Sequence, residues 1–284
     1  FAEGAPEITV DMVAAAERVA GLVFTAQERE TLVKRLAEYA ARYEALRAVP
    51  IPNDIPPAVM FNPFPHGSVT PKKEWKPIRL KPPKVDYSGR VEDLAFMPVT
   101  HLARLIETRK VSSTALTRMY LDRLKRFDPV LRCVVNLTED RALAQAKRAD
   151  SEIASGRYRG PLHGVPWGAK DLFAVKGYPT TWGAEQYRGK VTDHDAAVVE
   201  RLDDAGAVLV AKLTMGRFAS GDNWFGGQTR NPWNAAEGSG GSSAGPGAAV
   251  AGGLVGFAIV TETRGSIAGP SERCGISGLR PTFG

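Results

Sequence analysis

Residues 196–211 read AAVVERLDDAGAVLVA and predict a helix, a turn and a strand in succession. The first seven residues carry apolar side chains at helical spacing, and Gly206 supplies the break. Residues 208–211 then form a short, apolar, β-branched run of the kind found in buried strands. Because helices that alternate with short buried strands are characteristic of α/β proteins, this stretch predicts the α/β fold class.

Helical patterns also precede this stretch. Apolar residues repeat at helical spacing over residues 102–108, 114–127 and 139–154. The third of these helices opens with two acidic residues, which favour the positive end of the helix dipole, and Thr138 stands where an N-cap residue is expected.

The N-terminal part of the chain predicts a pair of helices followed by an extended segment. One amphipathic helix is expected over residues 10–22, and Thr25 with Glu28 forms a capping box at the start of another. Two helices cannot bury their apolar faces alone, so we expect residues 1–60 to form a helical hairpin and strap that pack on the rest of the protein. Residues 61–90, rich in proline and lysine, are interpreted as a linker.

The formal net charge of +6 is concentrated in one stretch. Residues 71–90 hold seven Lys or Arg, two acids and four prolines. Contact with a nucleic acid or a membrane surface is one explanation for such a stretch, but proline interleaved with charge is typical of an extended, solvated linker. We therefore expect no nucleic-acid partner.

Cysteine and histidine give no pattern of a metal site. The two cysteines lie far apart and belong to no CxxC pair, and no two histidines have metal-ligand spacing. No metal or other cofactor is therefore expected, and the redox compartment stays open. The residues concerned are Cys133, Cys274, His66, His101, His163 and His194.

The longest apolar run covers residues 248–260 and includes three glycines. Its 13 residues are too few for a membrane span, so none is expected. The sequence begins at Phe1 without a methionine, which suggests an upstream segment that was removed or left out. A cytoplasmic protein and one exported after loss of a signal both fit.

A glycine- and serine-rich segment, GSGGSSAGPG at residues 238–247, precedes an alanine-rich stretch. Glycine-rich loops before helices often bind phosphate, but the spacing here fits neither a Walker loop nor GxGxxG. A flexible linker is the other ordinary explanation, and the apolar run that follows argues against it. Ser242 in this segment and Ser266 beyond it are 24 residues apart, far enough for the chain to fold back and bring the two serines together.

A serine nucleophile needs a base, and no histidine is marked for that role. Residues 161–173 read PLHGVPWGAKDLF, in which Lys170 is the one cation of the Lys/Arg type within a largely apolar run. Burial lowers the pKa of an amine and would leave Lys170 able to accept a proton. The alternative is an amine that reaches solvent or pairs with Asp171, and the residues alone do not decide between the two.

Three elements in this order resemble the amidase signature family: GVPWGAKDLF at residues 164–173, GSGGSSAGPGAA from residue 238, and TETRGSIAGPSERCGISGLRPTFG from residue 261. The resemblance implies an α/β amidase signature fold, with a mixed β-sheet flanked by helices over residues 91–284. It also implies that this domain is incomplete at its C-terminal end.

The same resemblance assigns roles to individual residues. Lys170 would be the base of a Ser-Ser-Lys triad, and Ser242, preceded by a cis peptide bond from Gly241, would be the bridging serine. Ser266 would attack the carboxamide and form the acyl-enzyme. The remaining roles implied are a supporting hydroxyl on Ser243 and an oxyanion hole made by the backbone of Thr263, Arg264, Gly265 and Ser266.

The oxyanion loop departs from the family pattern. The family usually has glycine at the positions of Val260 and Arg264, and commonly a basic residue at that of Ala268. Glycine often serves a backbone conformation with positive φ, so Arg264 is expected to be strained.

The N-terminal segment has a resemblance of its own. Residues 8–56 are similar to the small C subunit of the tRNA-dependent amidotransferase, a helical hairpin and strap. A strap that is already fused favours a free-standing amidase, as a monomer or homodimer, acting on a small-molecule amide. Two other interpretations stay open: an A-type amidotransferase subunit that passes ammonia from glutamine to a charged tRNA, and a family member that has lost activity.

Overall fold

The computed structural model describes residues 7–52, 55 and 83–281. Its helices and strands fall into two compact units, one from the N-terminal segment and one from the remainder of the chain, and each unit is described by itself. Most of the predicted linker, residues 61–82, lies outside the described residues. Of its last part, Val85 and Tyr87 pack against a core cluster of the second unit.

The N-terminal unit is a helical hairpin of α1 (Val10–Ala20) and α2 (Ala26–Arg47). The predicted capping box is confirmed, since the Thr25 hydroxyl accepts from the Glu28 backbone N–H and the Glu28 carboxylate accepts from that of Thr25 at 2.7 Å. Glu17 and Arg29 join the two helices through an ion pair of 2.8 Å. No residue of α2 is buried, and its apolar side chains at Leu36, Tyr39, Tyr43 and Leu46 are exposed.

The second unit is a mixed α/β domain, as the sequence predicts. Its main sheet has the strand order β1-β3-β2-β8, in which β1 is antiparallel to β3 while β2 runs parallel to both β3 and β8. These strands are β1 (Val134–Leu137), β2 (Pro166–Lys170), β3 (Val208–Leu213) and β8 (Phe257–Ile259). Four short strands form two further hairpins: β4 (Asn223–Trp224) with β5 (Gly227–Gln228), and β6 (Arg230–Asn231) with β7 (Asn234–Gly238).

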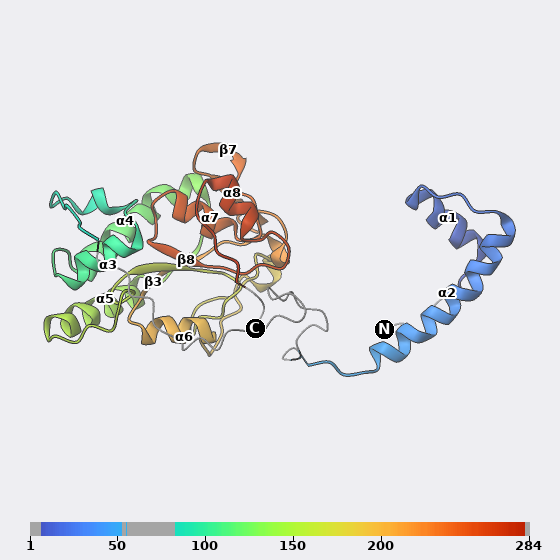
Figure 1. The fold of residues 1–284 in the computed structure, drawn as a ribbon, viewed down its shortest axis with the longest axis horizontal. Helices are drawn as coiled ribbons and strands as arrows, with labels where there is room; N and C mark the ends of the chain where they lie inside the picture. Colours follow the sequence, from blue (N-terminus) through green and yellow to red (C-terminus); the bar gives the residue numbers. More distant parts are fainter. Residues whose placement is uncertain (1–6, 53–54, 56–82, 282–284) are drawn as a thin grey trace, which may run out of the picture. The chain divides into compact units, whose positions relative to one another are not determined.

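Helices cover both faces of the main sheet (Figure 1). On one face, α6 packs its buried Val199 and Leu202 on Trp167 and Ala169 of β2. On the other, α7 packs in a cluster with residues of α4, α5 and β3. The helices are α3 (Val99–Glu107), α4 (Ser113–Leu131), α5 (Glu139–Ala154), α6 (Ala197–Asp204), α7 (Ala244–Ala251) and α8 (Ala268–Cys274), with 3-10 turns at Val91–Leu94, Glu185–Tyr187 and Arg217–Ala219.

One local expectation is confirmed in position but differs in its hydrogen bond. Thr138 holds the N-cap position of α5, but its side chain makes no capping hydrogen bond. The hydroxyl instead donates to the Leu209 carbonyl at 2.6 Å, which ties the start of α5 to β3. The buried Thr138 hydroxyl thus finds its hydrogen-bond acceptor on the neighbouring strand. The negative charges of Glu139 and Asp140 in the first turn still favour the positive end of the helix dipole.

Candidate active site

Lys170 is the last residue of β2, and its side chain is fully buried. The amine donates to the Ser242 hydroxyl at 2.8 Å, to the Thr261 hydroxyl at 2.9 Å and to the Thr261 carbonyl at 3.3 Å. Burial lowers the pKa of Lys170 to about 8, although the negative charge of Glu262 acts in the opposite direction. The alternative in which this amine reaches solvent or pairs with Asp171 is therefore wrong.

Ser242 lies in the glycine- and serine-rich loop that precedes α7, and 1% of its surface is exposed. The peptide bond between Gly241 and Ser242 is cis, as the resemblance implies. The Ser242 carbonyl accepts from the Gly216 backbone N–H at 3.1 Å. A Cβ on Gly241 or on Gly216 would lie 1.7 or 1.8 Å from the Gly221 carbonyl oxygen, so backbone packs directly on backbone around this serine.

Ser266 follows β8 in the chain and is reached from Ser242, whose hydroxyl donates to that of Ser266 at 3.0 Å. The three predicted site residues thus form one continuous chain from the buried amine to the outer serine. Ser266 is half-buried whereas Lys170 and Ser242 are buried. Ser266 is therefore the most exposed of the three residues.

Ser243 supports this arrangement from the neighbouring position. Its backbone N–H donates to the Ser266 carbonyl at 3.3 Å, and its hydroxyl donates to the Thr261 carbonyl at 3.3 Å. The same Thr261 carbonyl also accepts from the Lys170 amine. Hydrogen bonds of Ser243 and Thr261 therefore link Lys170 to Ser266 by a second route.

The predicted oxyanion loop has exposed Thr263 and Arg264 followed by half-buried Gly265 and Ser266. Positive φ occurs at Gly265, with φ of 93°, and not at Arg264. The expectation that Arg264 is strained is therefore wrong, because the left-handed residue of the loop is the glycine that follows it.

Glu262 fixes the other side of this loop. Its carboxylate accepts from the backbone N–H groups of Ile267 at 2.6 Å and Ala268 at 2.8 Å, directly after the outer serine. These donors, that of Ala268 above all, hold the pKa of Glu262 below its ordinary value. Arg280 pairs with the same carboxylate at 3.4 Å. The turn that carries Ser266 is thus held by a charged side chain that the sequence analysis did not single out.

Two further polar residues lie buried next to the end of β2. Asp171 and Lys212 are both fully buried and form an ion pair of 2.7 Å. The sequence analysis missed Lys212, although the signal used for Lys170, a lysine within an apolar run, is also present in VLVAKL at residues 208–213.

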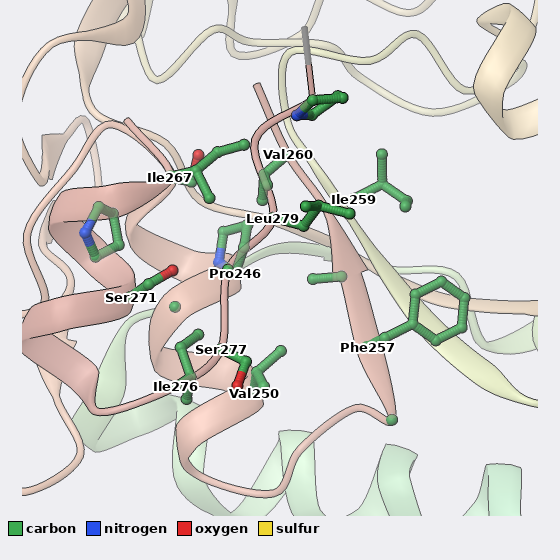
Figure 2. A pocket seen from close by; sticks show the side chains of 17 residues that line it. Pro246, Val250, Phe257, Ile259, Val260, Ile267, Ser271, Ile276, Ser277 and Leu279 are labelled. Atoms are coloured by element: carbon green, nitrogen blue, oxygen red, sulfur yellow. The ribbon is translucent and has the colours of Figure 1, made fainter. Parts of the chain in front are cut away.

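A pocket of about 610 Å³ lies beside the site, between β8, α7 and residues 276–281 (Figure 2). Its labelled side chains are mostly apolar, among them Val250, Phe257 and Leu279. Of the predicted site residues, only Ser243 lines it within the described part of the chain. This pocket therefore adjoins the hydroxyl chain without containing it.

Within the described ranges, no three His, Cys, Asp or Glu side chains come together as a metal-binding group. None of the helices in those ranges is both long and apolar enough to cross a membrane.

Comparison with protein families gives a match over residues 115–284 to the family described as Amidase. The chain belongs to the amidase family. Curated relatives of this amidase-family chain include the A subunit of the glutamyl-tRNA(Gln) amidotransferase of Methylococcus capsulatus, 45% identical over 189 residues, which make up 66% of this chain and 39% of the relative. The corresponding protein of Acidothermus cellulolyticus is 41% identical over 197 residues, 68% of this chain and 39% of the relative.

Solved amidase structures resemble about two thirds of this chain. The native peptide amidase from Stenotrophomonas maltophilia is 39% identical with a TM-score of 0.60, covering 63% of this chain and 39% of that one. A fatty acid amide hydrolase is 27% identical with a TM-score of 0.61, covering 64% and 32%. The amidase-family chain described here thus spans about two fifths of the length of the curated relatives it matches.

Proposed function

We propose that this protein hydrolyses the C–N bond of a carboxamide through an acyl-enzyme, with Lys170, Ser242 and Ser266 as a Ser-cisSer-Lys triad. The observation that carries the proposal is the continuous chain of 2.8 and 3.0 Å contacts from the buried amine through one hydroxyl to the next. A nucleophile and its base within hydrogen-bond reach, with the base held by further groups, is the arrangement that covalent catalysis requires.

In the proposed first half-reaction, neutral Lys170 takes the Ser242 proton while Ser242 takes that of Ser266. The Ser266 oxygen attacks the amide carbonyl, and the tetrahedral intermediate collapses as the leaving nitrogen receives a proton through the same two groups. Ammonia or an amine leaves, and the acyl group remains as an ester on Ser266. In the second half, water loses a proton to the same chain and cleaves that ester.

The oxyanion of each tetrahedral intermediate needs donors that are already in place. The backbone N–H groups of Thr263, Arg264, Gly265 and Ser266 are proposed for this role, since they lead directly to the nucleophile. In comparable sites one such donor contributes about 2.7 to 4 kcal/mol to transition-state stabilisation.

A fluorophosphonate probe tests the nucleophile directly. The protein is expected to bind one equivalent of probe at Ser266, and Ser266→Ala is expected to abolish labelling and amide hydrolysis together. Ser271→Ala, a serine outside the hydroxyl chain, is the matched control and should keep both. Labelling of Ser266→Ala at the normal rate, or a labelled peptide that lacks residue 266, would refute the proposal.

The pH dependence tests the base. Because only the neutral amine accepts a proton, the labelling rate should rise with pH and level off above the Lys170 pKa of about 8. A rate that is already level at pH 6 would mean that another group is the base.

A second candidate is an A-type subunit of a glutamine-dependent tRNA amidotransferase. The relatives from Methylococcus capsulatus and Acidothermus cellulolyticus, both named as such subunits, favour it. Ammonia release from glutamine that depends on a tRNA-binding partner would support this candidate. Hydrolysis of simple amides by a monomer or homodimer would support the free-standing amidase, and an activity screen over aliphatic, aryl and peptide amides separates the two.

A catalytically impaired family member is the third candidate, and Val260 with Arg264 in the oxyanion loop is its motivation. Failure of the probe to label a folded protein at any pH would favour this candidate. Labelling that appears only in Arg264→Gly would then identify the loop as the cause.

We further propose that the hairpin of the N-terminal unit acts as a fused strap on the amidase domain. Support comes from α2, which has exposed Leu36, Tyr39, Tyr43 and Leu46 and buries no residue within its own unit. Removing residues 1–60 should expose apolar surface on the remaining domain, lower its unfolding temperature and cause self-association. A truncated protein that stays monomeric and equally stable would contradict the proposal.

A further inference from the structure

The Asp171–Lys212 ion pair lies within a set of buried and half-buried polar groups. Lys212 lies 2.7 Å from the carboxylate and also donates to the Pro179 carbonyl at 2.6 Å and the Thr180 hydroxyl at 2.7 Å. The other carboxylate oxygen accepts from the Thr181 backbone N–H at 3.0 Å and from the Thr181 hydroxyl. Burial acts against both charges, raising the pKa of Asp171 and lowering that of Lys212, whereas each charge opposes the shift of the other.

This pair lies on the opposite face of the sheet from the amine of Lys170. In the parallel ladder of β2 and β3, Ala169 is paired with Lys212, and Lys170 with Leu213. Because side chains alternate along a strand, Ala169, Asp171 and Lys212 share one face while Lys170 points to the other. The pair therefore cannot exchange a proton with Ser242 or Ser266.

The pair instead contacts two segments next to the site: the end of β2 and loop 179–183. Asp171 directly follows Lys170 in the chain, and its backbone N–H donates to the Leu213 carbonyl at 2.8 Å. Through Thr180 and Thr181 the pair holds loop 179–183, where the Trp182 carbonyl accepts from the Phe218 backbone N–H at 2.9 Å.

That loop continues the connection to the bridging serine. Phe218 and Ala219 have positive φ values of 49° and 61°, a conformation that non-glycine residues keep only where their surroundings enforce it. Gly216, at the start of the same turn, donates its backbone N–H to Ser242 at 3.1 Å. The ends of β2 and of the serine loop are thus both tied to elements that the ion pair fixes.

We infer that Asp171 and Lys212 are a positioning pair, which holds the end of β2 and loop 179–183 so that the Lys170 amine stays aligned with Ser242. The inference rests on the proposed function of Lys170 as the base. It extends that function with two residues that never touch the substrate.

Two variants separate positioning from mere support of the fold. Asp171→Asn removes the charge but keeps the shape, and the double variant Asp171→Leu/Lys212→Met removes both charges and so leaves no uncompensated buried ion. For each, the pKa of the Lys170 amine is measured by NMR of protein containing ¹⁵N-lysine, with the resonance assigned through Lys170→Met. The charged groups that can influence this amine are Glu262 and, on the opposite face of the sheet, Asp171 and Lys212.

If the pair positions Lys170, the amine gains access to water in both variants. Its pKa should rise from about 8 toward the ordinary value of 10.5, and the probe should label Ser266 about 100-fold more slowly, in line with a misplacement of about 1 Å. For an amide substrate kcat should fall while KM stays nearly constant. A Lys170 pKa and a labelling rate that are both unchanged in a folded double variant would overturn the inference.

Arg141→Met is the matched control. Arg141 pairs with Asp195 at 3.0 Å with about a fifth of each side chain exposed, and among the described residues neither side chain is hydrogen-bonded to loop 179–183 or to the hydroxyl chain. This variant should lose some stability and leave the Lys170 pKa unchanged. If Ser266 of the wild type is never labelled, the proposed function fails, and the NMR measurement still decides whether the pair positions the amine.

Discussion

The two faces of the β2–β3 ladder each bury a lysine, and the two lysines differ in the partners they meet. Lys212 is fully buried and faces a carboxylate and two further oxygens. Lys170 meets two hydroxyls and one carbonyl, all neutral, and the charge that raises its pKa is that of Glu262. A buried amine that has a counter-ion can stay charged as structural support, whereas one surrounded by neutral acceptors gives up its proton at moderate pH. The choice of partner, more than burial itself, separates a supporting lysine from a candidate base.

The largest expected effect comes from removing the amine of the first lysine. Lys170→Met should slow probe labelling by about 10³-fold or more, because general-base assistance of this kind is lost altogether. Stability should not fall, since a side chain of similar length replaces an amine that burial disfavours. Stopped-flow labelling and urea unfolding measure the two quantities. A Lys170→Met variant that keeps full activity would show that Lys170 is not the base and would remove the distinction between the two lysines.

Removing the second lysine should affect stability instead. Lys212→Met leaves the Asp171 carboxylate buried without its counter-ion, which typically costs about 3 to 5 kcal/mol of unfolding free energy. Asp171→Leu, added to this change, should restore much of the loss because the unpaired charge is gone. Urea midpoints at pH 7 for the single and double variants give the answer, and equal midpoints for wild type and Lys212→Met would contradict it.

The pH dependence of stability should also reflect the lowered pKa of Lys170. The folded protein releases the Lys170 proton near pH 8 and the unfolded chain near 10.5, so between these values the unfolded state binds more protons. Stability should therefore rise with pH across this window, by about 3 kcal/mol from this one group. Lys170→Met should remove that rise, and Arg141→Met should keep it. The measurement is the free energy of unfolding from pH 7.5 to 10.5. If it changes with pH in the same way for wild type and Lys170→Met, the prediction is wrong.

The smallest expected effect concerns Glu262, the carboxylate whose charge raises the pKa of Lys170. Glu262 raises the pKa of the amine, so Glu262→Gln should lower it further and move the pH midpoint of probe labelling down by less than about 1 pH unit. Glutamine keeps an oxygen that can accept from Ile267 and Ala268, so the loop should remain in place. An upward shift would mean that the loop has moved and that Glu262 acts mainly through its hydrogen bonds.

Local patterns allowed much of the fold to be predicted. The capping box of Thr25 and the helix over residues 139–154 were found because their signals lie within a few residues of one another. The hydrogen bond of Thr138 to Leu209 was not, because it joins positions 71 residues apart. The short strands β4 to β7 were missed for a related reason, since strands of two to five residues leave almost no periodic pattern.

The candidate site was predicted in a different way. Lys170, Ser242 and Ser266 were identified from motifs, and the structure brings them together. Of the residues that hold them, Lys212 belongs to no motif used here, and Glu262 lies within a motif that assigns it no role. Their roles depend on which side chains they meet across the sheet or the loop, and that information appears only once the chain is folded.

The contact of Gly216, Gly221 and Gly241 behind Ser242 has a consequence for how sequences of this kind can vary. Two of these glycines lie so close to the carbonyl of the third that even a methyl group would overlap it. Even an alanine at Gly216 or Gly241 would therefore clash with the Gly221 carbonyl oxygen. No single substitution at these two positions avoids that clash without a shift of the backbone. Variation should instead gather at exposed positions such as Arg264, where a new side chain meets solvent. Among diverged sequences of this kind, we expect Gly216 and Gly241 to be retained while exposed positions such as Arg264 vary.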